Sequence, residues 1–370
     1  MKTRLPREEL AEALTAVAAI AGGRTTKPIL GCVRITTEGE AIELSATDGE
    51  AALRLRVGSF RVEEPGEAVV PADQLHNIVR ELPDAEIRLD ADGRFFTVCG
   101  AGSEFKVFTL ASADYPPVPS FDDEPDLVMD GRQLWRMISL TSYAAARETS
   151  RYAINGVLWE KRGKRLHLVA TDGRRLARSS GAVTRSSAAD FEVIVPIKAL
   201  IAFERVFGHC HEQEDWTIDI KVMPNQILLR SGDRMLSTVL IEGTFPKYDE
   251  VIPRDSTRQA LVNRAELVAG IRQAALLASE EARAVRLSFA ADLLVITAQS
   301  AEHGEARVEL PVEFKGEALQ IGFNPAFFND ALKVLNVPNV RLEFQDSFRP
   351  GVISGDDLAD FLYVIMPVSL

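Results

Sequence analysis

The stretch Leu168-Val-Ala-Thr-Asp-Gly-Arg-Arg-Leu-Ala-Arg178 decides how the whole chain is organised. Alternating Leu166, Leu168 and Ala170 predict a strand that runs into a tight turn at Thr-Asp-Gly, since glycine accepts positive φ without a Cβ clash. A second strand is expected from Arg174. The same Ala-Thr-Asp-Gly stands in Leu44-Ser-Ala-Thr-Asp-Gly-Glu-Ala-Ala-Leu53, 124 residues earlier (171 − 47). This spacing predicts that the chain repeats one structural unit.

Three successive units follow the same predicted order of helix, strands, helix and strands, with a period of roughly 120 residues. The first helices are expected at 6–21, 131–147 and 263–279, and the second helices at 71–82, 196–207 and 324–335. In the third unit, Gln299-Ser300-Ala301 takes the place of the Thr-Asp-Gly turn. The period is too long for a solenoid, so each unit is expected to be a small domain.

The predicted fold class is α+β, with three tandem, structurally similar domains that each pack two helices on one side of an antiparallel sheet. The acidic segment Asp122-Asp-Glu-Pro-Asp126 has the composition of a linker. The expected boundaries are 1–122 for the N-terminal domain, 127–252 for the central domain and 257–370 for the C-terminal domain.

The composition favours a soluble globular protein, with 46% apolar and 26% charged residues in 370. No stretch has the length of apolar sequence that crosses a bilayer, and the first residues contain no apolar signal-peptide core. We therefore expect a cytoplasmic protein with no membrane partner. The three cysteines have no close spacing, so neither a disulfide framework nor a Cys-x-x-Cys site is indicated.

Two features resemble catalytic or metal sites but have simpler interpretations. Asp48 and Asp172 each precede a glycine, and such aspartates cap their own turns. Three neighbouring residues, His209-Cys210-His211, cannot supply the tetrahedral ligand set of a zinc site by themselves. This segment is better interpreted as the end of a helix after Phe207. No nucleophile, acid–base pair, metal site or cofactor is predicted, and the chain is expected to be no enzyme.

Charge is distributed unevenly along the chain, whose net charge is −12. The helical windows 6–24, 72–82, 131–151, 197–207, 263–283 and 326–336 contain 13 Lys and Arg against 11 Asp and Glu, so they carry +2 and the remainder −14. If the protein meets nucleic acid, the helical face is therefore expected to meet it. The candidate contacts to phosphate are Arg24, Arg80, Arg132, Arg136, Arg147, Arg151, Lys198, Arg205, Arg264, Arg272 and Lys333.

Several motifs resemble the bacterial sliding clamp family, the beta subunit of DNA polymerase III, and the resemblance covers the full length. They are Thr171-Asp-Gly-Arg-Arg-Leu-Ala177, Phe245-Pro-Lys-Tyr-Asp-Glu-Val-Ile-Pro253, Asn324, Gly23-Arg24 with Pro28-Ile-Leu-Gly31, and Tyr363-Val-Ile-Met-Pro-Val-Ser-Leu370. The resemblance implies a non-catalytic processivity factor, a head-to-tail homodimer that closes into a ring around duplex DNA without reading its sequence. It also implies a peptide pocket for the replicative DNA polymerase alpha subunit, the clamp-loader ATPase, and other polymerases and repair proteins that carry short linear motifs.

The residues that the resemblance implies fall into two groups. The peptide-binding pocket would be formed by Ile154, Thr171, Gly173, Arg174, Arg175, Leu176, Pro246, Val251, Asn324, Phe327, Val364, Met366, Pro367, Val368 and Leu370. Contacts to DNA would come from Arg24, Arg80, Arg136, Arg147, Arg151, Tyr152, Lys198 and Arg205. Three positions depart from the family pattern: Glu250 replaces a basic residue, Ala282 a larger aromatic residue and Ser369 an arginine. Peptide preferences are therefore expected to differ.

Two other functions compete with this interpretation. One is a homo-oligomeric peptide-binding scaffold that never encircles DNA, and it would not need its helix arginines on one concave face. The other is a hydrolase that uses Asp172, for which Asp172→Asn would abolish activity instead of perturbing a turn.

Overall fold

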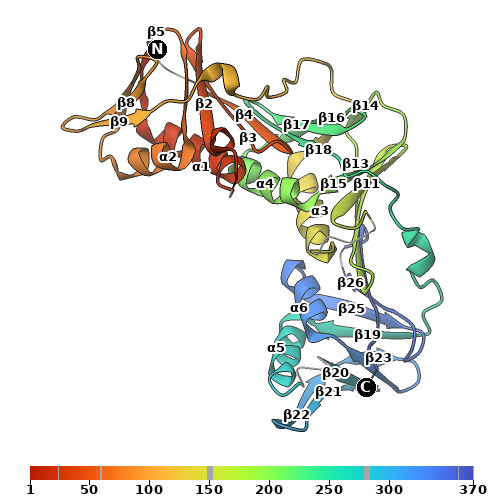
Figure 1. Cartoon of the computed structure of the whole chain (residues 1–370). Helices are drawn as coiled ribbons and strands as arrows, with labels where there is room; N and C mark the ends of the chain where they lie inside the picture. Colours follow the sequence, from red (N-terminus) through yellow and green to blue (C-terminus); the bar gives the residue numbers. More distant parts are fainter. Residues whose placement is uncertain (24, 59–60, 148–152, 279–283, 357, 370) are drawn as a thin grey trace. The chain divides into compact units, whose positions relative to one another are not determined.

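The computed structural model describes residues 1–23, 25–58, 61–147, 153–278, 284–356 and 358–369 (Figure 1). The predicted contacts Arg24, Arg151, Tyr152 and Leu370, together with Ala282, lie outside the described residues. The chain divides into two compact units, one made of Met1–Arg132, Val183–Ala188 and Lys198–Leu240, the other of Gln133–Ala182, Ala189–Ile197 and Ile241–Leu370.

The first unit contains two antiparallel sheets. The five-stranded sheet has the order β5 (Arg61–Glu64), β1 (Lys2–Pro6), β7 (Glu86–Ala91), β8 (Phe95–Cys99), β9 (Glu104–Phe108). The nine-stranded sheet has the order β14 (Arg185–Ser186), β10 (Leu127–Asp130), β16 (Thr217–Val222), β17 (Gln226–Ser231), β18 (Arg234–Val239), β4 (Ala51–Val57), β3 (Ala41–Thr47), β2 (Cys32–Glu38), β6 (Glu67–Pro71).

Helices α1 (Arg7–Ala21) and α2 (Ala72–Glu81) pack side by side in this unit, and α1 also lies against β3 and β4 (Figure 1). Leu10, Leu14 and Val17 repeat at helical spacing and are fully buried, so one apolar stripe fixes the face of α1 that meets the sheet. Helix α4 (Ile197–Phe207) buries Leu200, Phe203 and other residues in the same manner.

The second unit also contains two antiparallel sheets, a nine-stranded one and a four-stranded one. Its nine-stranded sheet has the order β15 (Phe191–Pro196), β11 (Gly156–Arg162), β12 (Arg165–Thr171), β13 (Arg175–Ala182), β27 (Phe361–Ile365), β26 (Gly351–Gly355), β25 (Asn339–Phe344), β19 (Arg258–Asn263), β23 (Glu313–Lys315). Its four-stranded sheet has the order β22 (Gly304–Pro311), β21 (Leu293–Ser300), β20 (Val285–Ala290), β24 (Leu319–Phe323).

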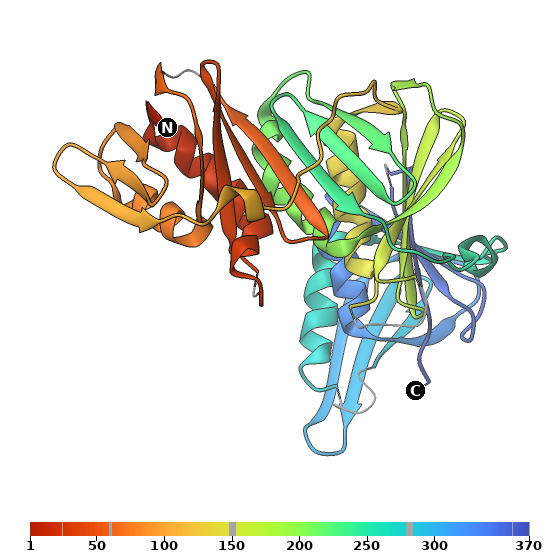
Figure 2. The same cartoon turned by 45° about the horizontal axis from the view of Figure 1, so that its top comes forward.

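Helices α5 (Arg264–Ala275) and α6 (Pro325–Val334) lie side by side in the second unit, and α5 packs against β21 and β22 (Figure 2). Asn263 caps α5 by accepting a hydrogen bond from Glu266 N, and Asn324 caps α6 by accepting one from Ala326 N. Helix α3 (Gly131–Thr141) begins the central repeat.

The predicted triplication is confirmed, because each third of the chain has the order strand, helix, five strands, helix, three strands. Two helix ends were predicted wrongly. Helix α3 ends at Thr141, not Arg147, where the Thr141 hydroxyl donates back to Met137 O and a 3-10 turn at Ser142–Ala144 follows. Helix α5 ends at Ala275, before residue 279.

Each repeat divides its strands between two sheets, and sheets of successive repeats join edge to edge. The first repeat's β4 pairs with the second repeat's β18, and the second repeat's β13 pairs with the third repeat's β27. In the third repeat the equivalent of β4 and β13 is β22, and in the first repeat the equivalent of β18 and β27 is β9. Among the described residues, β22 and β9 do not pair with another repeat, and each lies at the edge of its sheet.

Candidate binding cavity beside the second Thr-Asp-Gly turn

The two Thr-Asp-Gly turns have the same hydrogen bonds. The Thr171 hydroxyl donates to Arg175 O at 2.6 Å and accepts from Gly173 N at 3.1 Å, while Asp172 Oδ1 accepts from Arg174 N and Arg175 N. In the first turn, Thr47 and Asp48 make the corresponding four bonds with residues 49–51. Gly173 and Gly49 have φ of 84° and 94°, where a side chain would be strained. Both aspartates therefore cap their own turns, as predicted.

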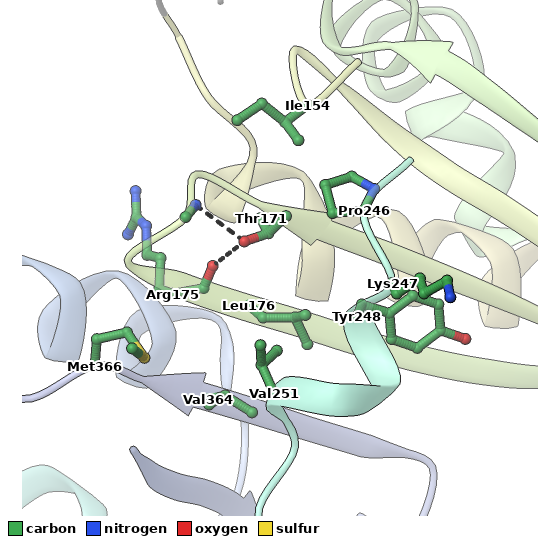
Figure 3. Close-up of a pocket in the computed structure, with 11 residues that line it drawn as sticks. Ile154, Thr171, Arg175, Leu176, Pro246, Lys247, Tyr248, Val251, Val364 and Met366 are labelled. Atoms are coloured by element: carbon green, nitrogen blue, oxygen red, sulfur yellow. Dashed lines mark hydrogen bonds between the residues drawn. The ribbon is translucent and has the colours of Figure 1, made fainter. Parts of the chain in front are cut away.

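A cavity of about 320 Å³ opens beside the second turn. It lies within the second unit, and its wall is mainly apolar (Figure 3). The lining residues are Ile154, Thr171, Gly173, Arg175, Leu176, Pro246, Lys247, Tyr248, Val251, Val364 and Met366. Leu176 and Val364 are almost fully buried, whereas Val251 and Met366 remain 47% and 40% exposed. A cavity with a buried apolar floor and exposed apolar rim residues can receive apolar side chains of a ligand.

The Arg175 guanidinium is held by a network of internal acceptors. Its Nε donates to Asp172 Oδ2 at 2.9 Å, its Nη1 to Asp330 Oδ2 at 2.8 Å and its Nη2 to Tyr143 O at 3.0 Å. The guanidinium also lies over the Phe327 ring, 4.5 Å from the centroid. Burial disfavours its charge, but the hydrogen bond with Asp330 and the negative charge of Asp172 outweigh it and hold the pKa of Arg175 above its usual value.

Tyr248 lies in the cavity wall on the 3-10 helix Tyr248–Val251, and its hydroxyl donates to Glu160 Oε2 at 2.7 Å. Glu160 is 2% exposed and also pairs with the Arg162 guanidinium. Burial raises the pKa of the Glu160 carboxyl, but these two partners lower it more, so that pKa is below its ordinary value. The carboxylate therefore fixes the direction of the Tyr248 ring.

The C-terminal segment forms the remaining wall. Strand β27 pairs with β13, and Met366 N then donates to Arg174 O at 2.9 Å. The Tyr363 hydroxyl donates to Phe327 O at 2.9 Å. These bonds place Val364 opposite Leu176 and bring Met366 to the same cavity, although nearly 200 residues separate both from Leu176 in sequence.

Some predicted pocket residues do not line the cavity. Arg174 contributes its carbonyl to the C-terminal segment, Asn324 caps α6, and Phe327 lies beneath the Arg175 guanidinium. Pro367 and Val368 line a neighbouring hollow with the exposed Phe348. Sequence reasoning missed Lys247 and Tyr248, although both stand inside the quoted motif between Pro246 and Val251. Their position between Pro246 and Val251, two residues predicted to line the pocket, was the available signal.

The predicted basic contacts have different surroundings. Arg136, Arg147 and Arg205 are exposed, and exposed Arg80 lies 3.3 Å from Glu81. Lys198 Nζ lies 2.5 Å from Asp48 Oδ2 and 3.7 Å from Glu50 Oε2.

Two further helix arginines have structural partners. Arg132 donates to the carbonyls of His211 and Gln213, and Arg264 donates to those of Val337 and Leu332. Both guanidinium groups therefore hold neighbouring backbone segments of the fold in place.

Within the described ranges, no cluster of three His, Cys, Asp or Glu side chains could hold a metal ion. The 3-10 helix Gly208–Glu212 follows α4 and contains the His-Cys-His segment. None of the helices in the described part of the chain has the length and apolar character needed to span a membrane.

Three family models together match almost the whole chain. They are the N-terminal domain of the DNA polymerase III beta subunit at residues 1–119, its central domain at 128–247 and its C-terminal domain at 249–369. Among curated relatives, the beta sliding clamp of Escherichia coli K12 is 33% identical, with 100% of both chains covered. That of Chlamydia muridarum is 32% identical and covers 100% of this chain and 99% of its own.

Solved structures give the same result. The DNA polymerase III subunit beta of Pseudomonas aeruginosa matches with a TM-score of 0.93 at 33% identity, and both chains are covered completely. A second structure from that organism, bound to griselimycin, matches with the same TM-score, identity and coverage. The sliding clamp of Bacillus subtilis has a TM-score of 0.93 at 25% identity, with 100% of this chain and 99% of its own covered.

Proposed function

Because this chain belongs to the family of the DNA polymerase III beta subunit, the bacterial sliding clamps, we propose that two copies close head to tail into a ring around duplex DNA. In this proposal the chain is a processivity factor without catalytic activity of its own. The ring tethers the partner proteins that carry out the chemistry, and it works in the cytoplasm, where bacterial DNA lies.

The ring proposal is based on two sheets, each of which ends in an edge strand that pairs with no other repeat among the described residues. At each junction inside the chain, a four-stranded half-sheet joins a five-stranded half-sheet through the pairs β4–β18 and β13–β27. The five-stranded sheet that ends in β9 and the four-stranded sheet that begins with β22 are the two halves left over. Pairing β22 of one copy with β9 of another would repeat the same junction, and doing so twice closes a dimer and removes both exposed edges.

Side chains near these two edges support that pairing. Phe105 and Phe108 on β9 are 39% and 64% exposed, and Leu276 beside α5 is 79% exposed. Both edges also carry charges of each sign: Glu104 and Lys106 on β9, Glu305, Arg307 and Glu309 on β22. Apolar residues that are exposed in one copy and flanked by complementary charges are typical of an interface.

The helices are proposed to meet the DNA. Arg80, Arg136, Arg147 and Arg205 are exposed and could contact phosphates, and Arg24, Arg151 and Tyr152 keep the same proposed role. Such contacts carry no sequence information, and a net charge of −12 on the whole chain disfavours tight binding elsewhere. Enclosure would hold the DNA while weak contacts allow sliding.

The apolar cavity is proposed to dock short linear motifs of the replicative DNA polymerase alpha subunit, the clamp-loader ATPase, and other polymerases and repair proteins. Its buried floor and exposed apolar rim suit apolar anchor side chains of an extended peptide. A relative that binds griselimycin supports ligand binding by this family. The domain boundaries 1–122, 127–252 and 257–370 remain part of this proposal.

Site-directed cross-linking tests the ring. In a Cys99→Ser background, Lys106→Cys and Arg307→Cys place one thiol on each free edge, and a short bis-maleimide is added. The proposal predicts a covalent dimer and no ladder of larger species from the double variant, because two cross-links close the ring. Either single variant should remain uncoupled. A ladder, or dimers from a single variant, would instead indicate an open or different assembly, such as a scaffold that does not encircle DNA.

A further inference from the structure

Two cationic side chains line the cavity, and they differ in what they can still bind. Arg175 and Lys247 lie at opposite sides of the apolar residues Leu176, Val251 and Val364 (Figure 3). A ligand that fills the cavity would pass both. Which of the two recognises a negative charge on the ligand depends on the partners that each already has.

The Arg175 guanidinium is already occupied. Carboxylates of Asp172 and Asp330 and the carbonyl of Tyr143 accept from Nε, Nη1 and Nη2 at 2.8–3.0 Å. One face of the guanidinium is covered by the Phe327 ring, and only 7% of the side chain is exposed. Three of the five N–H donors of Arg175 are therefore already bonded, and a ligand carboxylate that took any of these donors would have to displace Asp172, Asp330 or the Tyr143 carbonyl.

The Lys247 ammonium, in contrast to the Arg175 guanidinium, is available to a ligand. Lys247 is exposed, and none of the residues that the structure describes forms an ion pair or hydrogen bond with its ammonium. Tyr248, the next residue of the cavity wall, has its ring held in place by the hydrogen bond to Glu160. A flexible ammonium beside a rigid apolar wall can reach a carboxylate on a peptide that already has its apolar side chains in the cavity.

The two acidic residues that follow Lys247 do not remove this capacity. Asp249 Oδ1 lies 3.7 Å from Arg178 Nη1, so its charge is partly balanced elsewhere. Glu250 is exposed on the same 3-10 helix. It would repel an acidic residue placed near it, which restricts the favourable position to the end of the cavity where Lys247 lies.

We propose that Lys247 selects an acidic side chain in the docked peptide, and that Arg175, although it lines the cavity, does not. The preferred ligand is therefore a linear segment with apolar anchors of the Leu or Phe kind and one carboxylate at the Tyr248 side. This inference rests on the proposed docking of peptides in the cavity.

Fluorescence anisotropy with synthetic peptides tests it. The probes are fluorescein-labelled peptides with one Leu-Phe anchor pair and otherwise neutral residues, in which a single Asp is moved through each non-anchor position. Matched versions carry Asn or Lys at the same position. They are titrated with the full-length protein, with Lys247→Gln, with Lys247→Glu, and with Lys164→Gln as a control for loss of an exposed lysine outside the cavity.

At one position, the Asp peptide should bind the unaltered protein about threefold more tightly than the Asn peptide, as expected for a largely solvent-exposed ion pair. Lys247→Gln should bring this ratio close to one, and Lys247→Glu should favour the Lys peptide. Lys164→Gln should behave like the unaltered protein. The preference should also shrink between about 0.05 and 0.3 M salt.

Two results would overturn the inference in different ways. If the Asn peptide binds but Lys247→Gln still binds the Asp peptide more tightly than the Asn peptide, another group recognises the carboxylate and only the inference fails. If no peptide binds any of the proteins, docking in this cavity fails, and the inference fails with it.

Discussion

Arg175 Nη1 lies 2.8 Å from Asp330 Oδ2, although 155 residues separate the two in sequence. The pair joins the first residue of β13, directly after the second Thr-Asp-Gly turn, to α6, beside the pairing of β13 with β27. At the other continuous sheet, Lys198 Nζ on α4 lies 2.5 Å from Asp48 Oδ2 in the turn before β4. In both places an ion pair ties a Thr-Asp-Gly turn to the second helix of the next repeat, with the charges exchanged. Backbone pairing between repeats is thus accompanied by an ion pair, and we call Arg175–Asp330 and Asp48–Lys198 the two internal locks.

Asp330→Asn should weaken the lock at the cavity. Arg175 is buried and would lose one of its two carboxylate partners, so the free energy of unfolding is expected to fall by about 1–2 kcal/mol. The melting temperature should drop by about 2–4 °C per kcal/mol, as measured by calorimetry. Lys333→Gln on the same helix is the control and should leave it unchanged. A melting temperature equal to that of the unaltered protein would show that the pair contributes nothing.

Asp48→Asn should destabilise the first lock in a pH-dependent way. Burial raises the pKa of Asp48, but hydrogen bonds from the Ala51 backbone and the nearby Lys198 lower it more, so its pKa is below its ordinary value. A carboxyl with a depressed pKa adds stability above its unfolded pKa and loses it as the pH falls through the folded value.

The variant should therefore be about 1 kcal/mol less stable than the unaltered protein at pH 7, and the gap should narrow as the pH falls below about 4. Urea denaturation of both proteins at pH 7, 5 and 3 measures it. A gap that stays constant over this range would mean that the charge of Asp48 plays no part.

Tyr248→Phe removes the donor that the buried Glu160 carboxylate accepts from at 2.7 Å. We expect a loss of about 1–2 kcal/mol and a rise in the pKa of Glu160, because the hydroxyl lowers that pKa at present. The loss should largely vanish in a Glu160→Gln background, so a double-mutant cycle measured by urea denaturation separates the pair from other effects. Additive losses would show that the two side chains are not coupled.

Leu276→Asp should break the dimer. Leu276 is 79% exposed next to α5, the helix that packs against the free strand β22. A carboxylate buried there without a partner would cost several kcal/mol in each of the two interfaces. Light scattering after gel filtration should therefore show a monomer. Met223→Asp, at an exposed apolar residue on the turn between β16 and β17, should remain dimeric. A dimer in both variants would place the interface elsewhere.

The sequence predicted the features that local chemistry controls. Asp-Gly at both turns specified their shape, and apolar spacing located all six helices named above. The predicted ends of α3 and α5 were too late, because apolar residues continue at helical spacing through Ser142–Ala144 and Leu276, where the backbone changes from α-helical bonds to bonds between residues three apart. Strand β1 was missed, since its partners β5 and β7 lie about 60 and 85 residues further on and five residues carry little signal.

The cavity was only partly predictable. Motifs of the resembling family supplied most of its walls, but Lys247 and Tyr248 were overlooked and Phe327 proved to lie beneath Arg175. The partner of Arg175 could not be predicted, because Asp330 comes near only when β27 has paired with β13. In the third repeat, Ser300 keeps one bond of the threonine by accepting from Glu302 N at 3.3 Å, but no aspartate follows it. The third turn therefore lacks the aspartate that caps the other two turns.

Retention on circular DNA tests the central claim, which is enclosure of the duplex. The protein is loaded onto nicked circular DNA with a clamp loader and ATP, the complex is isolated at moderate salt, and the circle is cut once. The account predicts stable retention on the intact circle and release after the cut, because the ring slides off a free end. Equal retention before and after the cut would mean direct binding to the DNA surface, and would contradict the ring.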